Sequence, residues 1–173
     1  MDNICEQIVQ KARTSGDKAK IAAILILGAL LAAAVVFLAL ISGLWFFILF
    51  AIGIMGLGVW LAGNMNVEYE YILTNNEMDI DKVIGRRKRK RMITLDLSNA
   101  EEFAAYPSEN DIKADVTVHA SSGLEKDAHY LVVNHSSYGK VNLIFNPNEK
   151  IREAIMQEIP NTLRIKIVHN VKS

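Results

Sequence analysis

Residues 21–63 read IAAILILGALLAAAVVFLALISGLWFFILFAIGIMGLGVWLAG, and this stretch decides how the rest of the chain is organised. It contains two apolar segments, 21–41 and 44–63, which are joined by a Ser-Gly pair, and it carries no charged side chain. A bilayer core about 30 Å thick requires roughly 20 apolar residues in a helix. The sequence therefore predicts two transmembrane helices that form a tight hairpin.

Two alternatives fit the apolar pattern less well. A signal peptide has an apolar region of about 7 to 15 residues followed by a cleavage site, whereas the first segment here is longer and continues into the second. A buried hairpin in a soluble protein would need a large surrounding core. Residues 67–173 are too few to cover two wholly apolar helices, so the membrane interpretation is preferred.

Composition divides the chain into three regions. The 173 residues carry a formal net charge of +0, and the 51% of hydrophobic residues are concentrated in the hairpin. We expect an N-terminal segment over residues 1–20, the hairpin over 21–63, and one compact domain over 67–173 of common domain size. The one cysteine, Cys5, excludes an intrachain disulfide and a cysteine-based zinc site.

Charges beside the hairpin predict its orientation. Four cations, Lys11, Arg13, Lys18 and Lys20, precede the first apolar segment, and the Ser-Gly connection is uncharged. The positive-inside rule then predicts a multi-pass protein of the cytoplasmic (inner) membrane with both termini in the cytoplasm.

The N-terminal segment and the hairpin carry two further helical patterns. Residues 2–12 place apolar side chains at helical spacing, which predicts a short amphipathic helix at the lipid headgroups or a frayed lead-in to the hairpin. Small residues, which allow close helix packing in a membrane, occur at Gly28 and Ala32 and again at Gly53 and Gly56 with Gly58. We expect these residues to pack the two membrane helices together, and a homodimer of hairpins remains open.

After the hairpin the apolar pattern changes to alternation, which is typical of strands with one buried face. The expected strands are 67–73, 77–84, 92–97, 116–120, 130–133 and 141–145. Residues 98–107 fit either a helical turn or a short edge strand. An amphipathic helix follows over 147–159, with Asn146 as its cap and Pro160 at its end. The pattern predicts a mainly β (α+β) domain of about seven antiparallel strands closed by one C-terminal helix.

Four stretches of this domain resemble the bacterial pleckstrin-homology-like (PH-like) domain. They are Tyr69-Glu70-Tyr71 with Leu73-Thr74, Met78-Asp79-Ile80-Asp81, the basic turn Gly85 to Arg91 leading into Ile93-Thr94-Leu95, and Phe145-Asn146-Pro147-Asn148-Glu149-Lys150. The whole chain resembles small bacterial membrane proteins in which two spans precede such a domain. The resemblance implies an orthogonally packed sheet of seven strands, or a partly open barrel, with one end blocked by the helix.

The resemblance implies a binding module without naming its ligand, because this fold hosts lipid, peptide and protein binding alike. Phosphoinositide recognition is not implied, since the eukaryotic signature has its basic residues around the first hairpin, which here is Asn75-Asn76. An oligonucleotide-binding barrel is the alternative fold, and it would lack the closing helix.

No catalytic constellation stands out from the sequence. His129 and His135 would lie too far apart along one strand to share a metal ion, and no glycine-rich phosphate loop is present. Asp79 and Asp81 share one face of a strand, where salt partners on neighbouring strands are the simplest explanation. We expect no enzymatic activity, no cofactor and no metal site.

One feature of the domain stands out as a candidate binding site, namely a run of six consecutive cations. They are Arg86, Arg87, Lys88, Arg89, Lys90 and Arg91. Arg89 and Arg91 share the alternation phase of the apolar Ile93, so we expect the hairpin to project beyond the core. A projecting tip close to an anionic membrane contacts lipid headgroups, at about 1 kcal/mol for each basic residue. A merely solvated tip is the alternative, and nucleic acid is disfavoured because interleaved aromatic residues are lacking.

These patterns together predict a membrane-anchored, non-enzymatic binding module. Its expected partners are anionic membrane lipid or another membrane protein, without nucleic acid. The alternative is a structural or accessory subunit of a membrane assembly that packs through the hairpin. An enzyme of unrecognised type is a third hypothesis, which a deep polar pocket with convergent carboxylates would favour.

Overall fold

The computed structural model of the chain describes residues 4–106, 112–123 and 127–170, and for 168–170 it describes the backbone alone. The chain forms two compact units. A helical unit contains residues 13–67 and 84–86, and a sheet unit contains residues 1–12, 68–83 and 87–173. The helical unit thus includes three residues from a turn that is distant in sequence.

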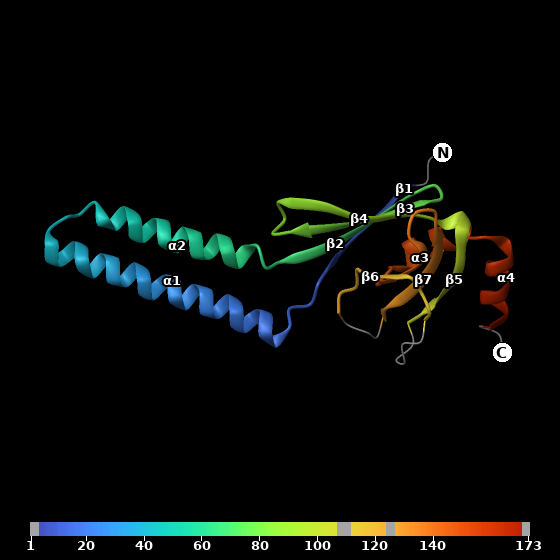
Figure 1. Cartoon of the computed structure of the whole chain (residues 1–173), viewed down its shortest axis with the longest axis horizontal. Coiled ribbons are helices and arrows are strands. Elements are labelled where there is room, and N and C mark those ends of the chain that lie inside the picture. The colour runs from blue at the N-terminus through green and yellow to red at the C-terminus, as the bar shows by residue number, and fades with distance from the viewer. Residues whose placement is uncertain (1–3, 107–111, 124–126, 171–173) are drawn as a thin grey trace. The chain divides into compact units, whose positions relative to one another are not determined.

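Two helices, α1 (Ser15–Ser42) and α2 (Phe47–Gly63), make up most of the helical unit (Figure 1). The predicted helical hairpin is confirmed, although α1 begins earlier than residue 21. A capping box explains the earlier start, because the Thr14 hydroxyl accepts from the Asp17 N–H at 3.2 Å and the Asp17 carboxylate accepts from the Thr14 N–H. At the other end, Gly43 has a φ of 70°, which terminates α1.

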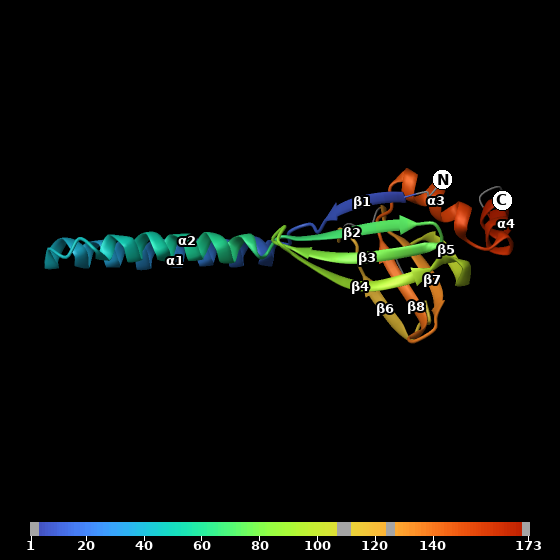
Figure 2. The ribbon, with the colours of Figure 1, turned by 90° about the horizontal axis from the view of Figure 1, so that it is seen from above.

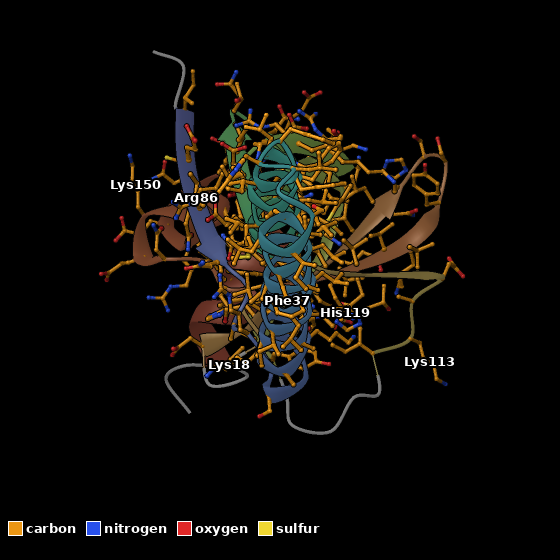
Figure 3. The ribbon with its side chains drawn as sticks, turned by 90° about the vertical axis from the view of Figure 1, so that its left-hand side faces the viewer. Lys18, Phe37, Arg86, Lys113, His119 and Lys150 are labelled. Carbon is orange, nitrogen blue, oxygen red and sulfur yellow. The ribbon has the colours of Figure 1, made fainter. Side chains whose placement is uncertain are left out.

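Both helices turn large apolar side chains outward. Phe37 is 62% exposed, and the most apolar 18-residue window of α1 is only 11% buried (Figure 3). A core helix of a soluble protein would bury such side chains. Among the described helices, α1 is long and apolar enough to cross a membrane, whereas α2 has 17 residues and is shorter. The length and composition of α1 are therefore consistent with a membrane anchor.

The contact between the helices uses only part of the predicted set of small residues. Gly28 and Ala32 of α1 are buried, as predicted. Gly53 and Gly56 of α2 are exposed, and a Cβ atom built on either meets no other atom within 4 Å. The prediction that these two glycines pack against α1 is wrong. The buried small residues of α2 are Ala51 and Gly58, of which Gly58 was expected, and they lie on another face of the helix.

The first sheet contains strands β1 (Ile4–Gln10), β2 (Val67–Thr74), β3 (Glu77–Ile84) and β4 (Lys88–Asp96), in the spatial order β1-β2-β3-β4 (Figure 2). The prediction of an amphipathic helix over residues 2–12 is wrong, because β1 pairs antiparallel with β2. Apolar residues four apart fit a strand as well as a helix. Here Cys5 and Val9 face the core, and Ile4 and Ile8 are exposed on the other face.

Strand β1 changes the bounds of the domain. Gln10 lies opposite Glu68, so the chain leaves the sheet unit at the end of one strand and returns to it at the start of the neighbouring strand. The whole helical hairpin is thus an insertion between two paired strands. The predicted range of 67–173 leaves out a strand of the sheet.

The second sheet contains β5 (Ala100–Ala105), β6 (Val116–His119), β7 (His129–His135) and β8 (Gly139–Phe145), in the order β5-β7-β8-β6. The described residues therefore form eight strands in two sheets and no closed barrel. The expectation of about seven antiparallel strands is corrected further by β6, which pairs parallel with β8. Both alternatives for residues 98–107 occur, because a 3-10 turn at Leu97–Asn99 leads directly into β5.

Two helices follow the second sheet, where the sequence predicted one. α3 covers Glu149–Glu158, and its N-cap is Asn148 rather than the predicted Asn146. α4 covers Asn161–Asn170. Pro160 separates them, because proline disfavours helical geometry in the preceding residue while its own carbonyl accepts from the Leu163 N–H at 3.0 Å. The same residue therefore ends one helix and begins the next.

The largest fully buried side chains of the sheet unit are apolar except for one tyrosine. They are Tyr71, Phe145, Leu73, Met78, Ile80, Leu95, Leu97, Leu131, Leu143, Ile151, Ile155 and Val132. The Tyr71 hydroxyl donates to the Ala120 carbonyl and accepts from the Asn146 N–H. Its ring meets Phe145 edge-on at 5.5 Å. Burial raises the pKa of Tyr71, which therefore stays neutral and keeps both bonds.

We predict that the sheet unit folds without the hairpin if β1 is kept. Replacing residues 13–66 by Asn-Gly joins β1 to β2 by a short turn, which their antiparallel register permits. This chain should be soluble and rich in sheet by circular dichroism. The fragment 67–173 loses β1 and the two hydrogen bonds of Gln7 to Asn146 and Asn148. It should unfold at lower urea, and equal midpoints would contradict the assignment of β1 to the sheet.

Candidate basic site at the end of the second helix

The basic run lies partly in a turn and partly in a strand. Gly85, Arg86 and Arg87 form the turn, and β4 begins at Lys88. The predicted third strand therefore begins four residues earlier than position 92. The projecting tip is correspondingly short, because four of the six cations belong to a hydrogen-bonded strand.

Gly85 and Arg86 belong to the helical unit, and Gly85 lies against the C-terminal end of α2. The Gly85 N–H donates to the Asn66 carbonyl at 2.8 Å. A Cβ atom on Gly85 would lie 2.9 Å from Asn64 Oδ1, and the φ of Gly85 is +58°. Both the close approach and the backbone conformation require glycine here. Arg86, whose φ is also 58°, is thereby placed next to the end of an apolar helix.

Cations gather at this same end of the helical unit. Arg13, Lys18 and Lys20 lie at or just before the start of α1, and Arg86 follows Gly85, which contacts the end of α2. The unit contains one carboxylate, Asp17, and its connection between the helices has no charge. One end of an apolar hairpin thus carries a basic collar, defined as Arg13, Lys18, Lys20 and Arg86. Such an asymmetry is typical of the side of a membrane protein that faces the cytoplasm.

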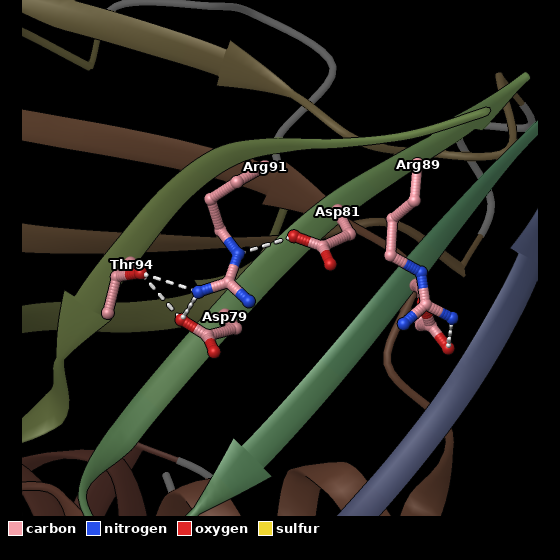
Figure 4. A network of polar contacts seen from close by, with 6 residues as sticks. Asp79, Asp81, Arg89, Arg91 and Thr94 are labelled. Atoms are coloured by element: carbon pink, nitrogen blue, oxygen red, sulfur yellow. Dashed lines mark hydrogen bonds and ion pairs between the residues drawn. The ribbon is translucent and has the colours of Figure 1, made fainter.

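Within the sheet unit, Arg91 is tied to two carboxylates of β3 (Figure 4). Its guanidinium contacts Asp79 at 2.7 Å and Asp81 at 2.5 Å. Thr94 completes the cluster, because it accepts from Arg91 and donates to Asp79. The hydrogen bond to Asp81 is the main reason why the pKa of Arg91 is raised. The expectation that salt partners on neighbouring strands explain Asp79 and Asp81 is confirmed.

These contacts correct the reason given for a projecting hairpin. Asp79 and Asp81 alternate with the buried Met78 and Ile80, so they lie on the face of the sheet opposite the core. Arg91 joins them on that face, whereas Ile93, two residues later, is buried in the core. The alternation is therefore interrupted between Arg91 and Ile93. Strand β4 is also exposed throughout Lys88 to Met92, so this end of the strand lies beyond the core, as expected.

Arg89 makes a second ion pair on the same face. It contacts Glu70 of β2 at 2.7 Å, and Glu70 is only 2% exposed. Burial raises the pKa of Glu70, and a hydrogen bond with Glu6 of β1 raises it further, while Arg89 acts in the opposite direction. The ion pair therefore offsets part of the cost of burying this carboxylate.

The six cations consequently divide into two groups. Arg89 and Arg91 hold β4 to β2 and β3 through carboxylates. Lys88 and Lys90 are exposed in the same strand, and Arg86 and Arg87 are exposed in the turn. Sequence reasoning missed the pairing of Arg89 with Glu70 and the contact of the turn with α2. Glu70 gave one signal, since it lies between Tyr69 and Tyr71 in β2, where a buried carboxylate needs a partner.

Other sequence candidates stay separate from this site. His119, His129 and His135 lie on three different parts of the second sheet, and the side chain of His169 falls outside the described residues. Within the described part of the chain, no group of three or more His, Cys, Asp or Glu side chains is placed to hold a metal ion.

Residues 1–165 match the model of a family described as Bacterial PH-like domain (DUF6106). The chain belongs to this family. The match covers both helices of the hairpin as well as the sheets of the PH-like domain. Comparisons with curated proteins and with solved structures found no match. The family assignment indicates a lipid-binding or protein-binding module, consistent with membrane anchoring through α1.

We predict that Gly85→Ala detaches the turn from α2, because the new Cβ atom would collide with Asn64. Gly123→Ala is the matched control, since Gly123 has a φ of +83° but open space around its Cβ position. Hydrogen exchange of the residue-85 amide in the detergent-solubilised chain is the measurement. Exchange should accelerate in the first variant and not in the control. Unchanged protection at residue 85 would show that the contact tolerates a side chain.

Removing Arg91 should destabilise the PH-like domain, whereas removing Lys90 should not. Arg91→Ala leaves the buried Asp81 carboxylate without its ion-pair partner, and we expect a loss of about 2 kcal/mol in the free energy of unfolding. Lys90→Ala changes an exposed side chain in the same strand and should alter this free energy by less than about 0.5 kcal/mol. Urea denaturation followed by circular dichroism compares the two. Equal losses would argue against a structural role for the network.

Proposed function

We propose that this chain is a non-enzymatic, membrane-anchored binding module whose basic turn contacts the headgroups of anionic lipids. Both helices cross the cytoplasmic membrane, and both termini lie on its cytoplasmic side. The 17 residues of α2 are at the lower end of the range of about 17 to 25 that spans a bilayer. The outward apolar side chains of both helices support this arrangement, because water would make their exposure costly.

One observation carries the proposal, namely the hydrogen bond between the Gly85 N–H and the Asn66 carbonyl. It holds Arg86 at the end of an apolar helix, where a spanning helix meets the headgroups. Arg87, Lys88 and Lys90 follow within four residues of sequence and are exposed. Arg13, Lys18 and Lys20 add three cations at the start of α1. Each cation near an anionic surface contributes about 1 kcal/mol.

The division of the six cations also supports headgroup binding. Arg89 and Arg91 are occupied with carboxylates and keep β4 in place. Lys88 and Lys90 are exposed in the same strand, and Arg86 and Arg87 are exposed in the turn before it. Guanidinium and ammonium groups in such an array suit phosphate oxygens, which accept several charge-assisted hydrogen bonds.

The test uses the full chain in vesicles that contain equal amounts of phosphatidylcholine and phosphatidylglycerol. After mild detergent extraction, mass spectrometry measures the lipids that remain bound. We expect enrichment of phosphatidylglycerol, a decrease of this enrichment as salt is raised, and its loss when Arg86, Arg87, Lys88 and Lys90 are replaced by Gln. The control replaces four exposed cations elsewhere, Lys113, Lys150, Arg152 and Lys166, by Gln. Equal loss in both variants, or no enrichment in the wild type, would contradict the proposal.

A second candidate function is supported by the outward face of α2. Gly53 and Gly56 are exposed there with open space around their Cβ positions, so another membrane helix has room to approach closely. The chain would then act as an accessory subunit of a membrane assembly or as a homodimer. Replacing both glycines by Ile would abolish such an assembly and leave lipid enrichment unchanged, which separates the two functions.

A further inference from the structure

Two groups compete for the Glu70 carboxylate on the face of the first sheet that is opposite the core. Glu70 pairs with Ile8 of β1, so Glu6 is its diagonal neighbour on this face, and the two carboxyl groups share a hydrogen bond. Arg89 reaches across β3 from β4 and contacts Glu70 at 2.7 Å (Figure 4). A hydrogen bond between two carboxyl groups requires a proton, whereas Arg89 favours the charged carboxylate. The two contacts therefore oppose each other.

The surroundings of Glu70 favour its neutral form. Asp81 of β3 lies on the same face and is paired with Arg91. Glu68 lies two residues before Glu70 in β2, so it also points to this face. Glu70 is only 2% exposed, and burial is the main cause of its raised pKa, which the neighbouring carboxylates raise further and Arg89 lowers. Glu70 therefore takes up a proton at a higher pH than an ordinary glutamate does.

Arg89 can leave its partner without disturbing the rest of the strand. Its side chain is 59% exposed, whereas the side chain of Glu70 is 3% exposed, so the guanidinium reaches water by rotating its own side chain. In the described part of the chain Arg89 pairs with one carboxylate, whereas Arg91 contacts two carboxylates and the hydroxyl of Thr94. Strand β4 therefore keeps the contacts of Arg91 when Arg89 is released.

We propose that Glu70 is a proton-controlled latch for Arg89, which withholds this cation from lipid headgroups until the carboxylate is protonated. A proton from solvent forms an O–H bond with Glu70, which donates it to Glu6, and the ion pair breaks. The freed guanidinium then joins Lys88 and Lys90, its exposed neighbours in β4. This inference rests on the proposed contact of the basic turn with anionic lipids. An anionic surface attracts protons as well as cations, so the same lipids favour the released state.

The test measures how much phosphatidylglycerol the full chain retains after extraction from mixed vesicles at about pH 7.5 and at about pH 5. The wild type should retain roughly fivefold more at the lower pH, the factor that one added cation contributes near an anionic surface. Glu70→Gln lacks the charge that holds Arg89, so it should retain the higher amount at both pH values. Glu77→Gln, an exposed position of β3, is the control and should keep the wild-type response. A wild type that does not respond to pH, or a Glu70→Gln variant that still does, would overturn the proposal.

A measurement without lipid separates failure of the latch from failure of the proposed function. In the detergent-solubilised chain, the NMR signals of the Glu70 carboxyl carbon and of Arg89 Nε should titrate together. Glu6→Gln should move this titration to lower pH, because an amide N–H donates to the charged form of Glu70. If Arg89 does not follow Glu70, the latch is wrong even where lipid is retained. If Arg89 is released and the wild type retains no phosphatidylglycerol at either pH, the proposed function fails rather than the latch.

Discussion

The buried hydroxyl of Tyr71 is the interaction on which the sheet unit depends, because it joins three segments that are far apart in sequence. It bonds to Ala120, just after β6, and to Asn146, just after β8, while its own strand belongs to the other sheet. A polar group in an apolar core is costly unless it is satisfied. The observed arrangement of the two sheets satisfies this hydroxyl, which favours it over an apolar packing that would leave the group unpaired.

Much of this architecture was predictable because its signals are local. Long uncharged apolar runs predicted α1 and α2, and alternation predicted β2 and β3. The errors came from long-range partners. Ile4 and Ile8 fit two periodicities, and only pairing with β2 decides between them. The second C-terminal helix, α4, was missed because its sequence has weak amphipathic character. Among residues 161–167, whose exposure is described, only Leu163 is buried.

The candidate site was predicted in composition but not in arrangement. Six adjacent cations are visible in any reading of the sequence, yet their division depends on Glu70, Asp79 and Asp81, which come from two other strands. Gly85 is a second example. A side chain at this position would collide with Asn64, and the sequence alone does not show that these two residues meet. A run of like charges therefore contains both structural and exposed members. The carboxylates reduce the mutual repulsion of the run and allow β4 to form.

The insertion of the hairpin between β1 and β2 also sets the order in which the chain assembles during synthesis. Strand β1 leaves the ribosome first, but its partner follows only after both apolar helices have been made. The sheet cannot be completed until the hairpin brings Gln10 and Glu68 together. Closing so long a loop is entropically costly unless its interior is already folded. A chain whose two helices do not pack together therefore keeps β1 unpaired, and it exposes both that strand and the open edge of β2.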